Sequence, residues 1–305
     1  MLKKDFVFLL ELMHKNAGWK FNEQQYVVIE KKISNFIRGK NYNSVNELIA
    51  ELKAGNHNLI NQVVENLAFS ETMFFRDAEV FAQLKNNILP KLKDKCRSRK
   101  ELNIWSLGCS SGQEAYSMAI LMDKCKKNFL DWKINISGSD ISAVAINKSQ
   151  RGVYNNFEIQ TGLNAQDILK YFENNNSNWQ AKDTLRLRID FRRYNIMDEI
   201  VGNKKYEMIL CRNVLCYFDA QYQDEILKRI SSHQPQGGYL VLGKDEKIPA
   251  LDKYYYPAPD TDNIFIAIGK QNSETIVNSN ISVSAPAGSG DSEQMPSFAR
   301  PRELY

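Results

Sequence analysis

The sequence predicts an α/β protein with a doubly wound, mostly parallel sheet, preceded by an all-α segment. Residues 1 to about 90 show only the helical periodicity of apolar side chains. After Lys100, short apolar runs alternate with longer amphipathic stretches. Strands separated by helical patterns are typical of βαβ units and therefore of a parallel sheet. A chain of 305 residues is also long enough for about two domains.

Composition excludes several classes of protein. A chain that is 43% hydrophobic and 25% charged is neither wholly disordered nor collagen-like. A net charge of +4 does not favour nucleic acid as the main partner. No apolar run reaches the roughly 18–20 residues that a membrane span needs, so we expect no membrane insertion. The five cysteines form no C-x-x-C pair, which favours a reduced, cytoplasmic protein without a zinc or other metal site.

The first 90 residues are expected to form a small helical bundle. Asn22 is a candidate N-cap for the second helix, and Ser44 with Glu47 fits a capping box for the third. Asp77 is expected to cap a further helix, which Pro90 should end. The amphipathic runs on which this prediction depends are residues 26–37, 44–52, 59–67 and 77–88.

The rest of the chain is expected to form the sheet. Its buried strands should be Leu102–Leu107, Ile134–Gly138, Met208–Leu210 and Tyr239–Leu242. Strict alternation over residues 185–191 predicts one half-exposed strand in an insertion, and the polar cluster at residues 174–178 predicts a turn at its tip. Residues 271–305 are rich in Ser, Asn, Gly and Pro, which predicts a disordered tail.

Two features at strand ends predict a ligand. Gly108 and Gly112 flank a turn between a buried strand and a helix, where backbone can approach a ligand closely, although a tight structural turn explains the same residues nearly as well. Asp140 ends the next strand, and a carboxylate there can bind both hydroxyls of a ribose. Its alternative role is the N-cap of the following helix. Together the two features indicate an adenosine-type ligand without separating NAD from S-adenosylmethionine.

Four segments, in order along the chain, match the motifs of one known family. They are residues 70–76 (S-E-T-M-F-F-R), 108–117 (G-C-S-S-G-Q-E-A-Y-S), 211–218 (C-R-N-V-L-C-Y-F) and 237–243 (G-G-Y-L-V-L-G). By these motifs the chain resembles the CheR family of chemotaxis receptor glutamate methyltransferases, which use S-adenosylmethionine. The resemblance runs from about residue 5 to 270. It departs from the family pattern at Ser70 (usually Asn), Ala115 (usually Pro) and Lys244-Asp245 (usually His-Ser).

The resemblance implies three parts and a set of site residues. The parts are a helical domain for receptor recognition at residues 1–90, an S-adenosylmethionine domain at 91–270, and a β insertion near 170–190. The residues at the family's cofactor contacts are Ser70, Thr72, Arg76, Gly108, Glu114, Asp140, Asn195, Ile196, Arg212 and Asn213. Arg76 and Tyr217 fall where the family lines the methyl-transfer centre, so the resemblance makes them the candidate catalytic residues.

The implied reaction is methyl esterification of glutamates on chemoreceptors by a cytoplasmic, monomeric enzyme. A glutamate of ordinary pKa, about 4.3, is already ionised at neutral pH and needs no general base. We expect Arg76 to orient a carboxylate, whereas Phe74 and Phe75 fit core packing and cofactor stacking equally. Two alternatives stay open at this point. One is a non-catalytic S-adenosylmethionine sensor or scaffold, and the other is a methyltransferase of the same fold that acts on another protein or a small acid.

Overall fold

The computed structural model describes residues 3–21, 25–68, 71–244 and 246–269. The expected N-cap Asn22, the predicted contact Ser70, Asp245 and the tail 271–305 lie outside the described residues. Among the described residues, no helix combines the length and the apolar character that crossing a membrane requires.

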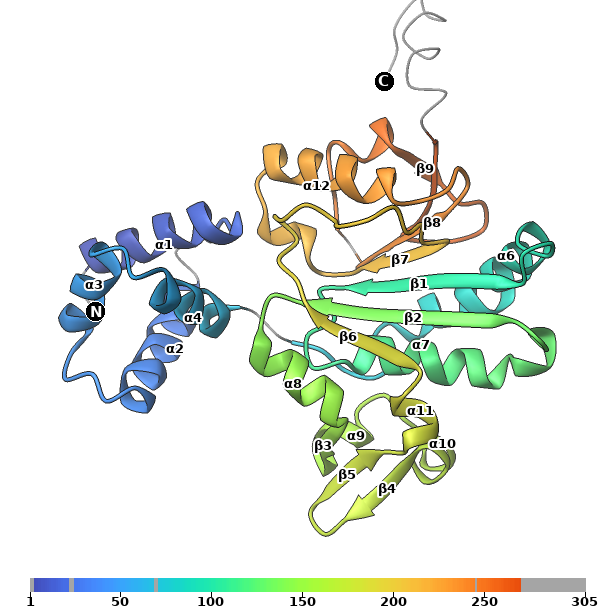
Figure 1. Cartoon of the computed structure of the whole chain (residues 1–305), viewed down its shortest axis with the longest axis horizontal. Coiled ribbons are helices and arrows are strands. Elements are labelled where there is room, and N and C mark those ends of the chain that lie inside the picture. The colour runs from blue at the N-terminus through green and yellow to red at the C-terminus, as the bar shows by residue number, and fades with distance from the viewer. Residues whose placement is uncertain (1–2, 22–24, 69–70, 245, 270–305) are drawn as a thin grey trace, which may run out of the picture. The chain divides into compact units, whose positions relative to one another are not determined.

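The first part of the chain forms helices with a core of their own. The helices are α1 (Lys3–Ala17), α2 (Tyr26–Gly39), α3 (Val45–Lys53) and α4 (His57–Leu67) (Figure 1). Buried apolar side chains from all of them pack together. The predicted capping box is half formed: Ser44 Oγ accepts from the Glu47 N–H, but the Glu47 carboxylate accepts from Asn43 instead of Ser44.

The next helical stretch packs with the sheet. It contains α5 (Ala78–Gln83), the π-helical turn η2 (Leu84–Ile88) and α6 (Leu89–Lys95). Its apolar residues join the core beside the sheet. Pro90 does not end a helix as predicted, because it stands in the first turn of α6, where its missing N–H is not needed.

Asp77 immediately precedes α5 but does not cap it through its side chain. Its backbone is left-handed, with φ 56°, and its carboxylate makes no hydrogen bond to the helix. The carboxylate is instead paired with Arg212. Asp77 therefore occupies the predicted N-cap position, but its side chain pairs with a cation that is distant in sequence and does not cap the helix.

The main sheet is mostly parallel and doubly wound, as predicted. Its strands are β1 (Glu101–Leu107), β2 (Lys133–Asp140), β6 (Ile189–Arg193), β7 (Met208–Cys211), β8 (Tyr239–Leu242), β9 (Tyr255–Pro257) and β10 (Ile264–Ala267). They lie in the order β6-β2-β1-β7-β8-β10-β9, with β10 antiparallel to both neighbours. The connecting helices and turns are α7 (Gln113–Lys124), η3 (Lys126–Asn128), α8 (Ala143–Arg151), η4 (Leu215–Tyr217), α12 (Ala220–Ser232) and η5 (Leu251–Lys253).

Both faces of the sheet are covered. Along β7, Met208 and Leu210 belong to the core that contains α7, whereas Ile209 and Cys211 belong to the core that contains α12. Figure 1 shows these two helices on opposite sides of the strands. β1 lies between β2 and β7, so the strand order reverses beside it. In open α/β sheets, ligands bind in the crevice at the carboxyl ends of the strands at such a reversal.

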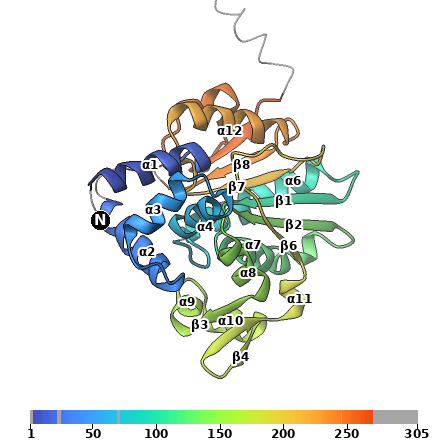
Figure 2. The ribbon, with the colours of Figure 1, turned by 60° about the vertical axis from the view of Figure 1, so that its left-hand side comes forward.

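A small antiparallel sheet is inserted between α8 and β6. It contains β3 (Val153–Asn155), β4 (Phe172–Asn175) and β5 (Asn178–Ala181), accompanied by α9 (Asn156–Gln160), α10 (Ala165–Tyr171) and α11 (Asp183–Arg186). Figures 1 and 2 both show it below the main sheet, near α8. The predicted turn after residue 174 is confirmed, because residues 176 and 177 connect β4 to β5.

The predicted strand at residues 185–191 is wrong in its first half. Leu185 is buried within α11, while Leu187 is 75% exposed in the turn that follows. Only from Ile189 does the chain form a strand, and that strand pairs with β2 at the edge of the main sheet. The alternating apolar residues thus combine one turn of helix with the start of β6, a difference that sequence periodicity alone does not resolve.

Candidate active site

A pocket lies at the carboxyl ends of β1, β2, β6 and β7, where the strand order reverses. Its wall contains every described residue that the sequence suggested as a contact: Thr72, Arg76, Gly108, Glu114, Asp140, Asn195, Ile196, Arg212, Asn213 and Tyr217. These residues come from segments far apart in the sequence, and the strand ends bring them together. Ser70 lies outside the described residues.

The turn after β1 requires glycine at its first position. Gly108 has φ 77°, and a Cβ there would collide with the side chain of Val214. The N–H groups of Gly108 and Cys109 both donate to the carbonyl oxygen of Ser139, at 2.8 and 2.9 Å. The tight turn therefore explains why residue 108 is a glycine. Gly108 also lines the pocket, so the close approach of this turn brings backbone atoms into the pocket wall.

Asp140 connects the two neighbouring strand ends. Its Oδ2 accepts from the Ser110 N–H at 2.8 Å and its Oδ1 from the Ser142 N–H at 2.9 Å. Burial raises the pKa of Asp140, and these backbone donors oppose the rise. The N-cap of α8 is Ser142, whose Oγ accepts from Ala145. The helix-cap alternative for Asp140 is therefore wrong, and each carboxylate oxygen retains capacity for a further donor.

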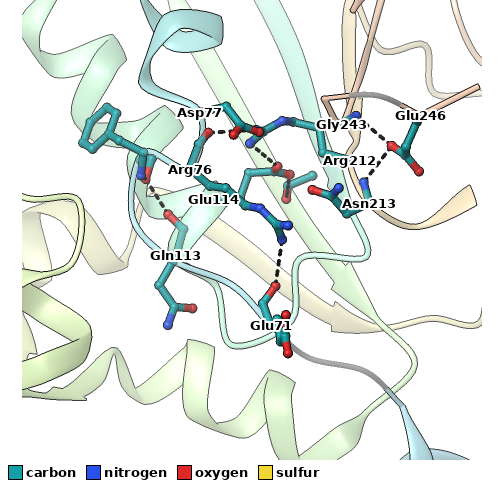
Figure 3. Close-up of polar contacts among 12 residues, drawn as sticks. Glu71, Arg76, Asp77, Gln113, Glu114, Arg212, Asn213, Gly243 and Glu246 are labelled. Atoms are coloured by element: carbon teal, nitrogen blue, oxygen red, sulfur yellow. Dashed lines mark hydrogen bonds and ion pairs between the residues drawn. The ribbon is translucent and has the colours of Figure 1, made fainter. Parts of the chain in front are cut away.

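A buried ion-pair network joins β7, α7 and the segment before α5. Arg212, whose side chain is 2% exposed, lies 2.6 Å from Asp77 Oδ2 and 3.2 Å from Glu114 Oε2 (Figure 3). Ser106 donates to the other oxygen of Glu114 at 2.7 Å. Burial raises the pKa of Glu114, whereas Arg212 and Ser106 lower it. The sequence does not identify Asp77 as a site residue, because nothing near it in the sequence indicates that it pairs with Arg212.

Arg76 stands between two residues with left-handed backbone. Phe75 has φ 47° and Asp77 has φ 56°, a conformation that costs about 1–3 kcal/mol at each non-glycine residue. The Phe75 N–H donates to Ser117 Oγ at 2.8 Å, and Arg212 donates to the Arg76 carbonyl oxygen at 2.8 Å. These anchors hold the strained backbone, and Figure 3 shows the Arg76 guanidinium extending to the carbonyl oxygen of Glu71, 3.1 Å away.

The two phenylalanines before Arg76 are packing residues. The Phe74 ring lies against Tyr154 and Phe172 of the insertion, and the Phe75 ring against Phe81 of α5. Neither lines the pocket. Of the two alternatives left open by the sequence, the structure supports packing.

The N-terminal helical part also contributes to the pocket wall, which the sequence did not predict. Trp19 lines the pocket and forms a β-bridge with Phe218. The next residue, Lys20, donates its backbone N–H to the Tyr217 carbonyl oxygen at 2.7 Å. Asn195 Nδ2 donates to a carbonyl oxygen at the end of α1, at 3.3 Å. The segment after α1 thus contacts the loops that follow β6 and β7.

Comparison with known families fits this geometry. The protein-family model described as "CheR methyltransferase, SAM binding domain" matches residues 70–264 of this chain. The chain belongs to the CheR family. It is therefore an S-adenosylmethionine-dependent methyltransferase, and the non-catalytic sensor has no support.

Curated relatives of this CheR-family enzyme match more than four fifths of the chain. It is 30% identical over 255 residues to chemotaxis protein methyltransferase 1 of Pseudomonas aeruginosa, a match that covers 82% of this chain and 93% of that protein. It is 31% identical over 268 residues to the chemotaxis protein methyltransferase of Borreliella burgdorferi, covering 85% and 93%. Among solved structures, PKMT2 from Rickettsia typhi in complex with AdoHcy is 14% identical over 47% of this chain and 21% of that one, with a TM-score of 0.31.

Two buried polar atoms in the CheR-family pocket suit the cofactor. Asn213 Oδ1 and Arg212 Nε have no hydrogen-bond partner among the described residues, and both residues line the pocket. A buried polar atom without a partner is costly, so a ligand that satisfies it gains affinity. The methionine part of S-adenosylmethionine carries an ammonium donor and a carboxylate acceptor, which are the groups that these two atoms require.

Proposed function

We propose that this enzyme methyl-esterifies glutamate side chains of chemoreceptors. Its curated relatives are named chemotaxis protein methyltransferases, which supports receptors as its substrates. In this proposal Asp140 holds the ribose hydroxyls of S-adenosylmethionine, Asn195 and Ile196 lie beside its adenine, and Arg212 with Asn213 holds its amino-acid end. The pocket-lining positions of these side chains support the assignments.

The reaction places modest demands on the protein. Bound S-adenosylmethionine supplies a methyl group on a positively charged sulfur. The accepting glutamate is ionised at neutral pH, so no side chain has to remove a proton from it. What remains for the chain is to align the acceptor and to exclude water.

The position of Arg76 in the pocket wall is the observation on which the proposal rests. Its guanidinium is on the pocket wall, and a planar fork of donors suits a carboxylate better than any other side chain does. The carboxylate nearest in sequence, Asp77, is already paired with Arg212, and both oxygens of Glu114 are occupied. Arg76 is therefore available to a carboxylate that enters with the substrate.

We propose that Tyr217 forms the other wall of the methyl-transfer centre. It lines the same pocket, and its backbone carbonyl is held by Lys20. Burial raises the pKa of Tyr217 above its ordinary value near 10, so its hydroxyl stays protonated at neutral pH. We propose that Tyr217 helps to shield the reacting groups from water.

The direct test is transfer of radiolabelled methyl from S-adenosylmethionine to membranes that carry the organism's own chemoreceptors. We expect label that mild base releases as volatile methanol, because carboxyl methyl esters hydrolyse under those conditions. Label that resists mild base would contradict ester formation. No labelling of receptors, with cofactor binding intact in calorimetry, would exclude them as the substrate.

Arg76→Ala should lower turnover by roughly 100-fold, because the acceptor carboxylate loses its alignment. Arg76→Lys should recover only a small part, since it restores the charge but not the fork of donors. Both variants should keep the wild-type melting temperature to within a few degrees. A large fall in melting temperature with normal specific activity of the folded protein would return Arg76 to a structural role.

A further inference from the structure

The loops after β7 and β8 meet at one carboxylate that the sequence analysis did not assign. Glu246 Oε2 accepts from the backbone N–H groups of Asn213 and Gly243, each at 2.7 Å (Figure 3). Glu246 Oε1 accepts from the N–H of Cys216 at 3.2 Å. One side chain thus holds three backbone donors, two from the loop after β7 and one from the end of β8.

Gly243 shows how closely this contact is built. A Cβ at Gly243 would lie 2.6 Å from Asn213 Nδ2 and 2.8 Å from Glu246 Oε2. Real Cβ atoms do not approach other heavy atoms so closely, so any side chain at residue 243 would displace Asn213 or Glu246. The position of Asn213 is therefore constrained in two ways, by close packing against Gly243 and by the hydrogen bond of its N–H to Glu246.

Asn213 is the part of this contact that faces the pocket. Its backbone is left-handed, with φ 57°, and its side-chain oxygen is buried without a partner among the described residues. Glu246 fixes the N–H of this unusual backbone and so fixes where the oxygen points. It also fixes the N–H of Cys216, the residue before Tyr217. Glu246 itself is not among the described residues that line the pocket.

We propose that Glu246 is a positioning residue for the cofactor site. It acts through Asn213 and Cys216, by holding the loop after β7 in the shape that presents the Asn213 oxygen to the ammonium end of S-adenosylmethionine. The inference rests on the proposed role of Asn213 in cofactor binding, but it does not depend on which protein is methylated.

The test measures binding of S-adenosylhomocysteine to the full chain by calorimetry, with no receptor present. Glu246→Ala should weaken binding by roughly tenfold or more, because the loop after β7 loses two charge-assisted hydrogen bonds and Gly243 loses a third. Glu246→Gln should fall between Ala and wild type, since one acceptor oxygen remains. Glu173→Ala, which removes an exposed carboxylate from β4 in the insertion, is the matched control and should bind like wild type.

A second variant covers the case in which Glu246→Ala does not fold. Gly243→Ala leaves Glu246 in place and should still weaken binding, because it displaces Asn213 by contact. In the Glu246 and Gly243 variants, the KM for S-adenosylmethionine should rise in parallel with the loss of affinity. Wild-type affinity in folded Glu246→Ala, or a lower melting temperature alone, would overturn the proposal. Failure to methylate receptors with these binding changes intact would count against the proposed substrate and not against Glu246.

Discussion

Arg212→Ala should lower the free energy of unfolding by about 3 kcal/mol, because it leaves the buried Glu114 without its cation. Arg212 also donates to Asp77 and to the Arg76 carbonyl oxygen, so its loss releases the segment that carries Arg76. Urea unfolding of the full chain measures the change, with the dependence on urea concentration expected to stay as in wild type. An exposed pair offers the matched control: Arg192→Ala, which breaks the contact with Asp190, should change stability by less than about 1 kcal/mol.

The pH dependence of this variant has a definite sign. Burial already raises the pKa of Glu114, and removing Arg212 removes the largest influence that lowers this pKa. A carboxyl group with a raised pKa in the folded state favours folding below its unfolded pKa, and that contribution is lost as the pH rises. The deficit of Arg212→Ala should therefore shrink as the pH falls through the raised pKa of Glu114, which lies above the ordinary glutamate value. Adding Glu114→Gln to Arg212→Ala should also recover part of the lost stability at neutral pH, because it removes the unpaired carboxylate. A double variant as unstable as Arg212→Ala would show that the unpaired carboxylate is not the cause of the loss.

Asp140→Ala should weaken S-adenosylmethionine binding by roughly 10- to 100-fold, since a charge-assisted acceptor is worth about 1.5–3 kcal/mol. The same change leaves the N–H groups of Ser110 and Ser142 without their carboxylate. Because burial raises the pKa of Asp140, wild-type affinity should begin to fall at a pH above the ordinary aspartate value as the solution is acidified. Calorimetry across pH measures both effects.

Ser142→Ala separates binding from local stability. It removes the hydroxyl that caps α8 but keeps the backbone N–H that Asp140 binds. It should cost about 1 kcal/mol of stability while the affinity for the cofactor stays unchanged. Equal losses of affinity in Ser142→Ala and Asp140→Ala would show that the integrity of α8, and not the carboxylate, governs binding.

The features that sequence predicted best are those with local causes. Gly108 and Asp140 follow apolar runs that read as strands, and the carboxyl ends of parallel strands converge on one edge of the sheet. The motif around Arg212 extended this to a third strand end. The structure places all of these side chains in one pocket.

The features that sequence missed depend on distant partners. From the sequence alone, Asp77 looks like a helix cap, because nothing local shows its partner Arg212. Glu246 likewise looks like one carboxylate among many, because its partners lie in a loop 30 or more residues earlier in the chain. The alternating apolar residues at 185–191 fit either one strand or a helical turn followed by a strand. Only the pairing with β2 determines that the strand begins at Ile189. Trp19 gave no signal, because its contact with Phe218 requires both parts of the chain to be folded.

That bridge has a consequence for how the enzyme is assembled. The pocket wall joins Trp19 to Phe218 and Lys20 to Tyr217, so during synthesis the wall is complete only after most of the chain has left the ribosome. Contacts between residues so far apart in sequence are slow to form, because a long loop has to close first. A ligand that binds this finished state and not the unfolded chain stabilises the finished state, by about 2.7 kcal/mol at 100 times its Kd. Cellular S-adenosylmethionine would thus protect newly made enzyme against unfolding as well as serve its reaction.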